Sequence, residues 1–278
     1  MNANQTHCLQ LLRDADPDRY LSVLYAPEDK RGALAALYAF NVEIARIRDL
    51  IHDPLPGEVR LQWWRDLING TEHGEAVGNP VAAALLEAIK AHNLPRAAFG
   101  NYCEARIFDL YDDPMPSRND LEGYCGETAS ALIQLASLVL DAEKAPAHAD
   151  MAGHAGVAQA ITGLLRLLPL HRRRGQVYIP ADILAAVGSS AETVLEGADK
   201  DAVKRAIDAM TALAEDHLGK YEAGAKSLPA ALRPAYLPVS LTGTYLKGIR
   251  ASGAAAADET AVVSPLKRQW VMLRASMR

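Results

Sequence analysis

The stretch from residue 158 to residue 180, AQAITGLLRLLPLHRRRGQVYIP, decides the fold of this chain. Its first half places apolar side chains at the i, i+3, i+4, i+7 spacing of one helical face, at Ile161, Leu164, Leu165 and Leu168. Pro169 is expected to end or kink this helix, because its ring clashes with the preceding turn and it supplies no N–H. The spacing therefore predicts a buried core helix that stops close to Pro169.

Four basic side chains follow the proline in a row, His171, Arg172, Arg173 and Arg174. Gly175 permits a turn, and the residues up to Pro180 are expected to leave in an extended form. Because arginine presents a planar fork of donors that matches phosphate oxygens, this cluster is a candidate anion site. The alternative is a solvated basic turn at the C-terminal end of a helix, where the helix dipole favours cations. The residues alone favour the solvated turn.

Composition excludes several classes of protein. The chain has 278 residues, 50% of them hydrophobic, which is enough for a sizeable core. Its net charge of −5 argues against a nucleic-acid binder, and its three isolated cysteines indicate neither a disulfide framework nor a zinc site. No secretory signal and no run of 18 apolar residues is apparent. We expect a cytoplasmic protein, with peripheral contact at the inner face of a membrane left open.

Helix start signals recur along the chain, in the form of a proline in the first turn at Asp16-Pro17, Ala26-Pro27 and Asn79-Pro80. Helices are expected over about 28–53, 58–69, 118–140 and 200–226, among others, and no strand-like alternation is longer than 176–179. We expect a single all-α domain of about ten helices over residues 1–250. A flexible linker and a short basic amphipathic tail are expected over 251–278.

Five separated segments resemble the squalene/phytoene synthase family, in the order in which the family has them. They are Tyr38-Ala39-Phe40, Trp64-Arg65-Asp66-Leu67, Asn79-Pro80-Val81, Tyr124, and the run from Arg173 to Pro180. The resemblance extends from about residue 17 to residue 250. It implies an all-α fold around a central cavity, in which the enzymes join two prenyl diphosphates head to head. It also implies two aspartate-rich motifs, whose carboxylates hold the magnesium ions that neutralise the diphosphate leaving group.

The acids of both motifs are largely missing from this chain. Counting along the resemblance places Ala45, Arg46 and Asp49 at the acidic positions of the first motif, and Leu167 and His171 at those of the second. A cation at Arg46 and an apolar side chain at Leu167 cannot hold a hydrated divalent ion. We therefore expect no metal site, no cofactor and no catalytic residues; magnesium is required only if the chain is an active synthase.

Two other groups of acids look like aspartate-rich motifs. Asp49 and Asp53 are four residues apart, and Asp109, Asp112 and Asp113 form a DLYDD string. Asp53 precedes a proline at an expected helix end, and Asp109 aligns with an acid at the end of a different helix in the family. We expect structural or capping roles for both groups.

A closer resemblance is to the branch of this family that contains the mitochondrial respiratory complex I assembly factor. That branch has FNVE at the start of the first motif, here Phe40 to Glu43, and an LR-x-x-P-x-H-x-x-R segment at the second, here Leu165 to Arg174. It implies a non-catalytic scaffold whose partners are complex I subunits or assembly proteins, with a prenyl diphosphate or lipid as the candidate ligand. The alternatives are an active head-to-head prenyl transferase acting on farnesyl or geranylgeranyl diphosphate, and a metal-independent reaction in the same cavity.

The family geometry implied by the resemblance brings the two motif helices opposite each other. We therefore expect an anion site at the turn formed by residues 171–174, with Arg46 facing it across the cavity mouth. Either a phosphate-bearing ligand binds there without metal or Arg46 pairs with an acid, and the position of Glu43 three residues before it on the same helix favours the pair. The candidate ligand-binding residues are Glu43, Arg46, Asp49, Arg166, His171, Arg172, Arg173, Arg174 and Tyr178.

Overall fold

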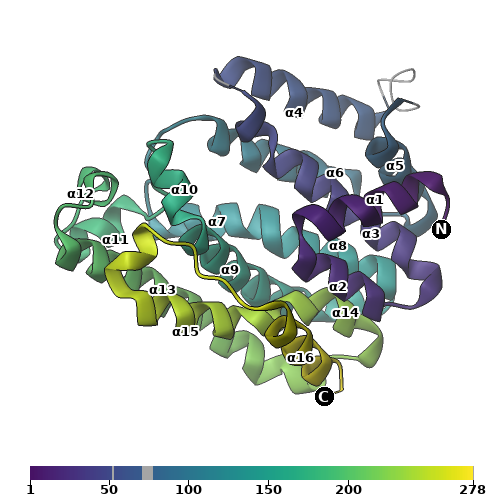
Figure 1. The fold of residues 1–278 in the computed structure, drawn as a ribbon. Helices are drawn as coiled ribbons and strands as arrows, with labels where there is room; N and C mark the ends of the chain where they lie inside the picture. Colours follow the sequence, from purple (N-terminus) through teal and green to yellow (C-terminus); the bar gives the residue numbers. More distant parts are fainter. Residues whose placement is uncertain (52, 71–77, 278) are drawn as a thin grey trace.

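The computed structural model describes residues 1–51, 53–70 and 78–277, and this part of the chain is helical with no strand (Figure 1). The helices of the first half are α1 (Ala3–Ala15), α2 (Pro17–Tyr25), α3 (Glu28–Ala45), α4 (Pro54–Asn69), α5 (Pro80–His92), α6 (Arg96–Ala105), α7 (Arg118–Cys125) and α8 (Ala131–Leu140). Those of the second half are α9 (Ala149–Arg166), α10 (Leu168–Arg173), α11 (Ala181–Ala186), α12 (Ala191–Glu196), α13 (Lys200–Gly224), α14 (Arg233–Tyr236), α15 (Thr242–Ser252) and α16 (Pro265–Ser276). The expected all-α fold is confirmed. None of the described helices is long and apolar enough to cross a membrane.

Two of the three predicted proline starts are present as expected, and at the third Pro27 occupies the N-cap position just before α3. Pro17 and Pro80 lie in the first turns of α2 and α5, where a missing N–H costs nothing. The preceding Asp16 accepts a hydrogen bond from the backbone N–H of Arg19, and Asn79 accepts two from the first turn of α5. Such side-chain caps replace hydrogen bonds that the first turn of a helix cannot make internally.

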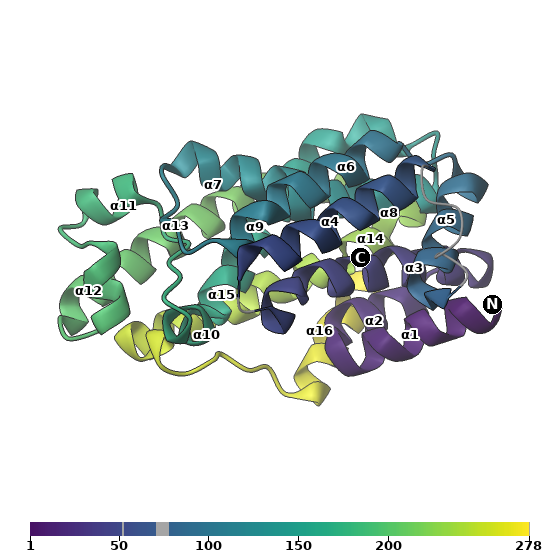
Figure 2. The same cartoon turned by 90° about the horizontal axis from the view of Figure 1, so that it is seen from above.

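The apolar faces meet around α3 and α9. The helix α9 packs against α13, α8 and α15, and α3 packs against α1, α5 and α8. The face of α9 predicted from its spacing is buried at Ile161, Leu165 and the neighbouring Ala158. Figure 2 shows that the packed helices form an elongated molecule, with α11 and α12 at one end and α5 at the other.

Two expected helices are interrupted. The helix expected to run to Asp53 ends at Ala45, and a 3₁₀ turn, η1 (Ile47–Leu50), follows it; His52 lies outside the described residues. A π-helical turn, η4 (Gly126–Ser130), separates α7 from α8. Gly156 of α9 lies against this turn so closely that an added Cβ would stand 2.3 Å from the Cα of Ser130. The tight approach accounts for a glycine in the middle of α9.

The kink expected near Pro169 is present. The helix α9 ends at Arg166, and Pro169 lies in the first turn of the separate short helix α10. There its missing N–H is tolerated, because the first turn of a helix needs no internal donor.

The segment after residue 250 is packed against the helical body. The helix α15 continues to Ser252, and a 3₁₀ turn, η9 (Gly253–Ala257), buries Ala256 and Ala257. This differs from the flexible linker that the small residues predicted, because alanines in this turn fit closely against α13. The amphipathic tail is present as α16; Arg278 lies outside the described residues.

Candidate functional site

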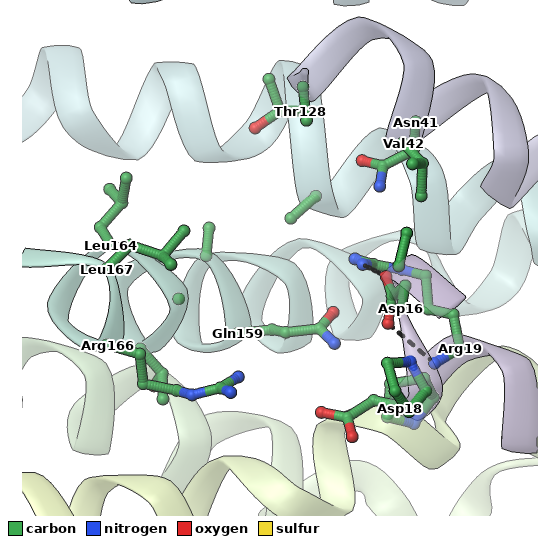
Figure 3. A pocket seen from close by; sticks show the side chains of 18 of the residues that line it. Asp16, Asp18, Arg19, Asn41, Val42, Thr128, Gln159, Leu164, Arg166 and Leu167 are labelled. Carbon is green, nitrogen blue, oxygen red and sulfur yellow. Dashed lines mark hydrogen bonds and ion pairs between the residues drawn. The ribbon is translucent and has the colours of Figure 1, made fainter. Parts of the chain in front are cut away.

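A cavity of about 830 Å³ lies between α1, α2, α3, α9, α15 and α16 (Figure 3). The end of α3 contributes Asn41, Val42 and Ala45 to its wall, and Arg46 follows at the helix C-cap. On the other side, α9 contributes Gln159, Thr162, Gly163, Leu164 and Arg166, followed by Leu167. The two helices that the family resemblance placed opposite each other therefore face the same cavity.

The opposite end of the cavity carries acids from the turn between α1 and α2. Asp14, Asp16 and Asp18 line it together with Arg19, and Figure 3 shows Gln159 and Arg166 extending from α9 toward this side. Sequence reasoning missed these residues as a site. The available signal was the alternation of three acids in RDADPDR, residues 13–19.

Two of these acids, Asp16 and Asp18, each form an ion pair with an arginine. Nη1 of Arg19 donates to Oδ2 of Asp16 at 2.6 Å. Nε of Arg268, on α16, lies 2.5 Å from Oδ1 of Asp18, and Tyr245 Oη donates to the other oxygen of Asp18 at 2.9 Å. The side chains of Asp18 and Arg268 are each less than one-fifth exposed. The Asp16–Arg19 pair is local to the start of α2, whereas the contacts of Asp18 join α2 to α15 and α16.

Arg166 reaches into the cavity and has no carboxylate partner in the part of the chain that the structure describes. Its guanidinium carbon lies 3.7 Å from the centroid of the Tyr245 ring, a cation–π contact, and its Nε donates to the carbonyl of Ala261 at 3.4 Å. The other cation on this wall, Arg46, is exposed, and it forms no ion pair with any described residue. The Glu43–Arg46 pair expected from the sequence is therefore absent. Water solvates an exposed guanidinium well, so an i, i+3 pair there adds only a few tenths of a kcal/mol.

A second polar cluster, formed by Arg106, Asp109, Tyr124 and Tyr178, adjoins the cavity wall at Arg106 and Tyr124. Asp109 accepts hydrogen bonds from Tyr124 Oη at 2.8 Å and from Tyr178 Oη at 2.9 Å, and Nη1 of Arg106 donates to its other oxygen at 2.9 Å. Burial, together with the negative charge of Asp109, raises the pKa of both tyrosines. Arg106 and Tyr124 line the cavity, whereas Tyr178 lies outside its lining. Asp109 thus joins Arg106, Tyr124 and Tyr178 in one cluster, and its structural role stays a prediction.

The other acids of the two groups that resemble aspartate-rich motifs lie away from the cavity lining. Asp112 accepts a hydrogen bond from Nη2 of Arg48 at 3.0 Å. Asp53 occupies the N-cap position of α4, although its side chain makes no capping hydrogen bond. Asp49 lies in η1, where Nη2 of Arg174 is 2.5 Å from its Oδ1.

The four basic residues after Pro169 point in different directions. Arg172 donates to the carbonyls of Leu195 and Ala257, at 3.0 and 2.9 Å, and to Asp258 at 2.5 Å. Arg173 is exposed. His171 is buried with its ring 4.6 Å from that of Tyr178, and burial lowers its pKa to about 4, so it is neutral at pH 7.

The structure therefore corrects the expected anion site. None of the four residues His171 to Arg174 lines the cavity. Consecutive residues of a helix point about 100° apart, so the side chains of His171 to Arg173 in α10 and of Arg174 at its C-cap do not converge on one ligand. Of the nine candidate residues, Arg46 and Arg166 line the cavity, together with the motif positions Ala45 and Leu167.

The described residues offer no group of three or more His, Cys, Asp or Glu placed to hold a metal ion. Magnesium prefers carboxylate oxygens that are free to coordinate it. Here Asp16 and Asp18 are paired with Arg19 and Arg268, and Asp14 accepts from the side chain of Gln10. The acids on the cavity wall thus do not fit a magnesium–diphosphate cage.

Comparison with known proteins identifies the family. The profile of the squalene/phytoene synthase family matches residues 12–268. "NADH dehydrogenase (ubiquinone) complex I, assembly factor 6" of Mus musculus is 33% identical over 245 residues, which cover 88% of this chain and 73% of that protein. The phytoene synthase of Mycobacterium tuberculosis is 25% identical over 265 residues, covering 94% of this chain and 86% of the enzyme.

Solved structures show the same fold. A dehydrosqualene synthase in complex with a ligand superposes with a TM-score of 0.82 at 20% identity, covering 99% of this chain and 95% of that one. Squalene synthase HpnC from Alicyclobacillus acidocaldarius gives a TM-score of 0.74 at 20% identity, covering 90% and 94%. With its helical cavity, the order of its motifs and the match across nearly its whole length, this chain belongs to the squalene/phytoene synthase family.

Proposed function

We propose that this chain is a non-catalytic member of the family that acts in the assembly of respiratory complex I. The observation that carries the proposal is the cavity wall where α3 and α9 face each other, which presents Ala45, Arg46 and Leu167. By the resemblance described above, these positions belong to the two aspartate-rich motifs. Support for the assembly role comes from relatives of that name, which are 32–33% identical over 88% of the chain in mouse and human.

The chemistry of the cavity supports the absence of synthase activity. Departure of a diphosphate needs a concentrated positive charge, which divalent ions held by several carboxylates provide in metal-dependent enzymes. The only acid left at the motif positions, Asp49, is paired with Arg174. A guanidinium at Arg46 would also repel a divalent cation.

A second candidate function is metal-independent binding of a prenyl diphosphate. The cavity persists at about 830 Å³, and both Arg46 and Arg166 face it without a carboxylate partner among the described residues. Arginine recognises phosphate oxygens through paired donors. Titration with a farnesyl thiodiphosphate analogue tests this function: binding that is equal with and without magnesium and is lost in Arg166→Met supports it, and magnesium-dependent binding contradicts it.

Turnover is tested with purified protein, farnesyl diphosphate and magnesium. We expect neither squalene nor presqualene diphosphate, because four of the five motif positions lack an acid. Turnover that disappears in Asp49→Ala but persists in the control Asp113→Ala would establish the alternative, an active head-to-head prenyl transferase.

The assembly role is tested by deleting the gene from its host and measuring assembled complex I on native gels. We expect the complex to decrease and to be restored by the wild-type chain. The Arg46→Met variant, which removes the unpaired cation at the cavity mouth, separates the two candidate functions. Full restoration by this variant shows that the scaffold suffices, and an unchanged amount of complex I after deletion would refute the assembly role.

A further inference from the structure

The helix α16 exposes a continuous apolar stripe. The stripe follows the i, i+4, i+7 spacing of one helical face at Leu266, Trp270 and Leu273, and Met277 extends it by one turn. Their exposed fractions are 80%, 60%, 41% and 68%. Single exposed apolar residues are ordinary, but four on one face, including a tryptophan, form a patch.

The same helix is anchored to the body by a different face. Met272 is completely buried with Leu241, Tyr245 and Val263, and Val271 packs against them. The Arg268–Asp18 pair holds this side as well. Because the inner face is already engaged, the outer stripe is presented to the surroundings and has no place in the core of the chain.

The neighbouring helix α2 enlarges the patch. It lies beside α16, as Figure 1 shows, and contributes Leu21, Leu24 and Tyr25 to a groove of about 510 Å³ shared with Leu266, Trp270 and Leu273. Leu24 and Tyr25 are both more than one-third exposed. The groove is thus lined by apolar and aromatic side chains from two helices, with Gln269 as its one polar member.

The charges beside the stripe indicate what covers it. From Pro265 to Ser276 the sequence contains Lys267, Arg268 and Arg274 and no acid, whereas the whole chain has a net charge of −5. Lys267 and Arg274 are seven residues apart and are exposed along one edge of the stripe. A basic edge beside an apolar stripe that carries a tryptophan is the arrangement of helices that lie in the interface of an anionic bilayer.

We propose that α16, with the outer face of α2, docks this protein on the surface of an anionic lipid bilayer. Leu266, Trp270 and Leu273 would enter the boundary between headgroups and acyl chains, and Lys267 and Arg274 would contact lipid phosphates. The cavity lies on the inner side of the same two helices, since Asp18 and Arg268 line it. Docking would therefore place the cavity next to the bilayer. This inference does not depend on the role in complex I assembly.

The test is flotation of the full chain with phosphatidylcholine vesicles and with mixed phosphatidylcholine–phosphatidylglycerol vesicles. We expect binding to the mixed vesicles that weakens as salt is added, since salt screens the lipid charge. Trp270→Glu should lower the partition coefficient roughly tenfold or more, because it places a charge where the docked protein would bury an apolar ring in the bilayer. The matched control is Leu55→Glu, at a leucine on α4 whose exposed fraction is 69%, against 60% for Trp270.

Three outcomes would overturn the proposal. The first is no binding of the wild-type chain to mixed vesicles. The second is equal loss in Trp270→Glu and Leu55→Glu, which would show that added negative charge alone explains the effect. The third is a dimer in sedimentation analysis that Trp270→Glu dissociates while vesicle binding is absent, which would identify the patch as a self-interface.

A paired Lys267→Gln and Arg274→Gln variant should lose the preference for anionic vesicles. Thermal melting of each variant verifies that it is folded.

Discussion

Nη2 of Arg174 lies 2.5 Å from Oδ1 of Asp49 and joins the end of α10 to the 3₁₀ turn that follows α3. The contact links, through an ion pair of opposite charges, the two segments at which the family resemblance places the aspartate-rich motifs. An acid and a base from facing segments stabilise each other without an ion between them. The pair lies outside the cavity lining, so it ties the two segments together without taking part in the cavity wall.

Arg172 is predicted to stabilise the fold. Replacing it with alanine removes hydrogen bonds to the carbonyls of Leu195 and Ala257 and an ion pair to Asp258. Because its side chain is only 13% exposed, we expect a loss of about 1–3 kcal/mol in the free energy of unfolding. Urea denaturation measures it. Arg173→Ala, an exposed neighbour, serves as the control and should change stability by less than about 0.5 kcal/mol; equal losses would contradict the assignment.

Asp109 is predicted to be needed for the polar cluster behind the cavity. Asp109→Ala leaves the hydroxyls of Tyr124 and Tyr178 and the guanidinium of Arg106 without their common acceptor. Leaving buried donors unpaired costs about 2–4 kcal/mol in total. Asp113→Ala, at an exposed position four residues later, should be close to neutral in the same denaturation experiment. A neutral Asp109→Ala would show that water replaces the acceptor.

His171 is predicted to make stability depend on pH. Its pKa in the folded state is about 4, below the ordinary value of 6.5, because burial disfavours the charged ring. The unfolded chain therefore binds more protons at this residue, and stability falls as pH decreases from about 6.5 toward 4. The contribution is fully present above pH 6.5. In His171→Phe, which keeps a ring against Tyr178, the loss of stability between pH 7 and pH 5 should be smaller than in the wild type. An identical pH profile would contradict the prediction.

Two glycines of α9 are predicted to respond oppositely to alanine. In Gly156→Ala the added methyl would stand 2.3 Å from the backbone of Ser130, so the π-helical turn must move. We expect a loss of about 1–3 kcal/mol from this overpacking. In Gly153→Ala the methyl meets nothing within 4 Å, and the substitution should be neutral or stabilise the helix by up to about 1 kcal/mol. Thermal melting of the two variants, side by side, decides between close packing and simple helix propensity.

The sequence by itself determined the all-α class and the elements whose start, end or buried face has a local signal. The spacing of apolar residues and the prolines that start or end a helix are local properties of the sequence. The buried face of α9, the break near Pro169 and the proline starts of α2 and α5 could therefore be predicted from neighbouring residues. The ordered motifs also indicated the family, which the match over residues 12–268 confirms. The interruption of the first long helix at Ala45 was not predicted, because no proline or glycine marks it.

Only the tertiary structure decided which charges meet. Arg172, Arg173 and Arg174 are adjacent in sequence, yet successive positions on a helix turn by about 100°, so they reach Asp258, solvent and Asp49 in turn. In contrast, Asp18 and Arg268 are far apart along the chain and meet at the cavity wall. Local patterns carry no information about such pairs, because the partner of a side chain is set by how whole helices pack.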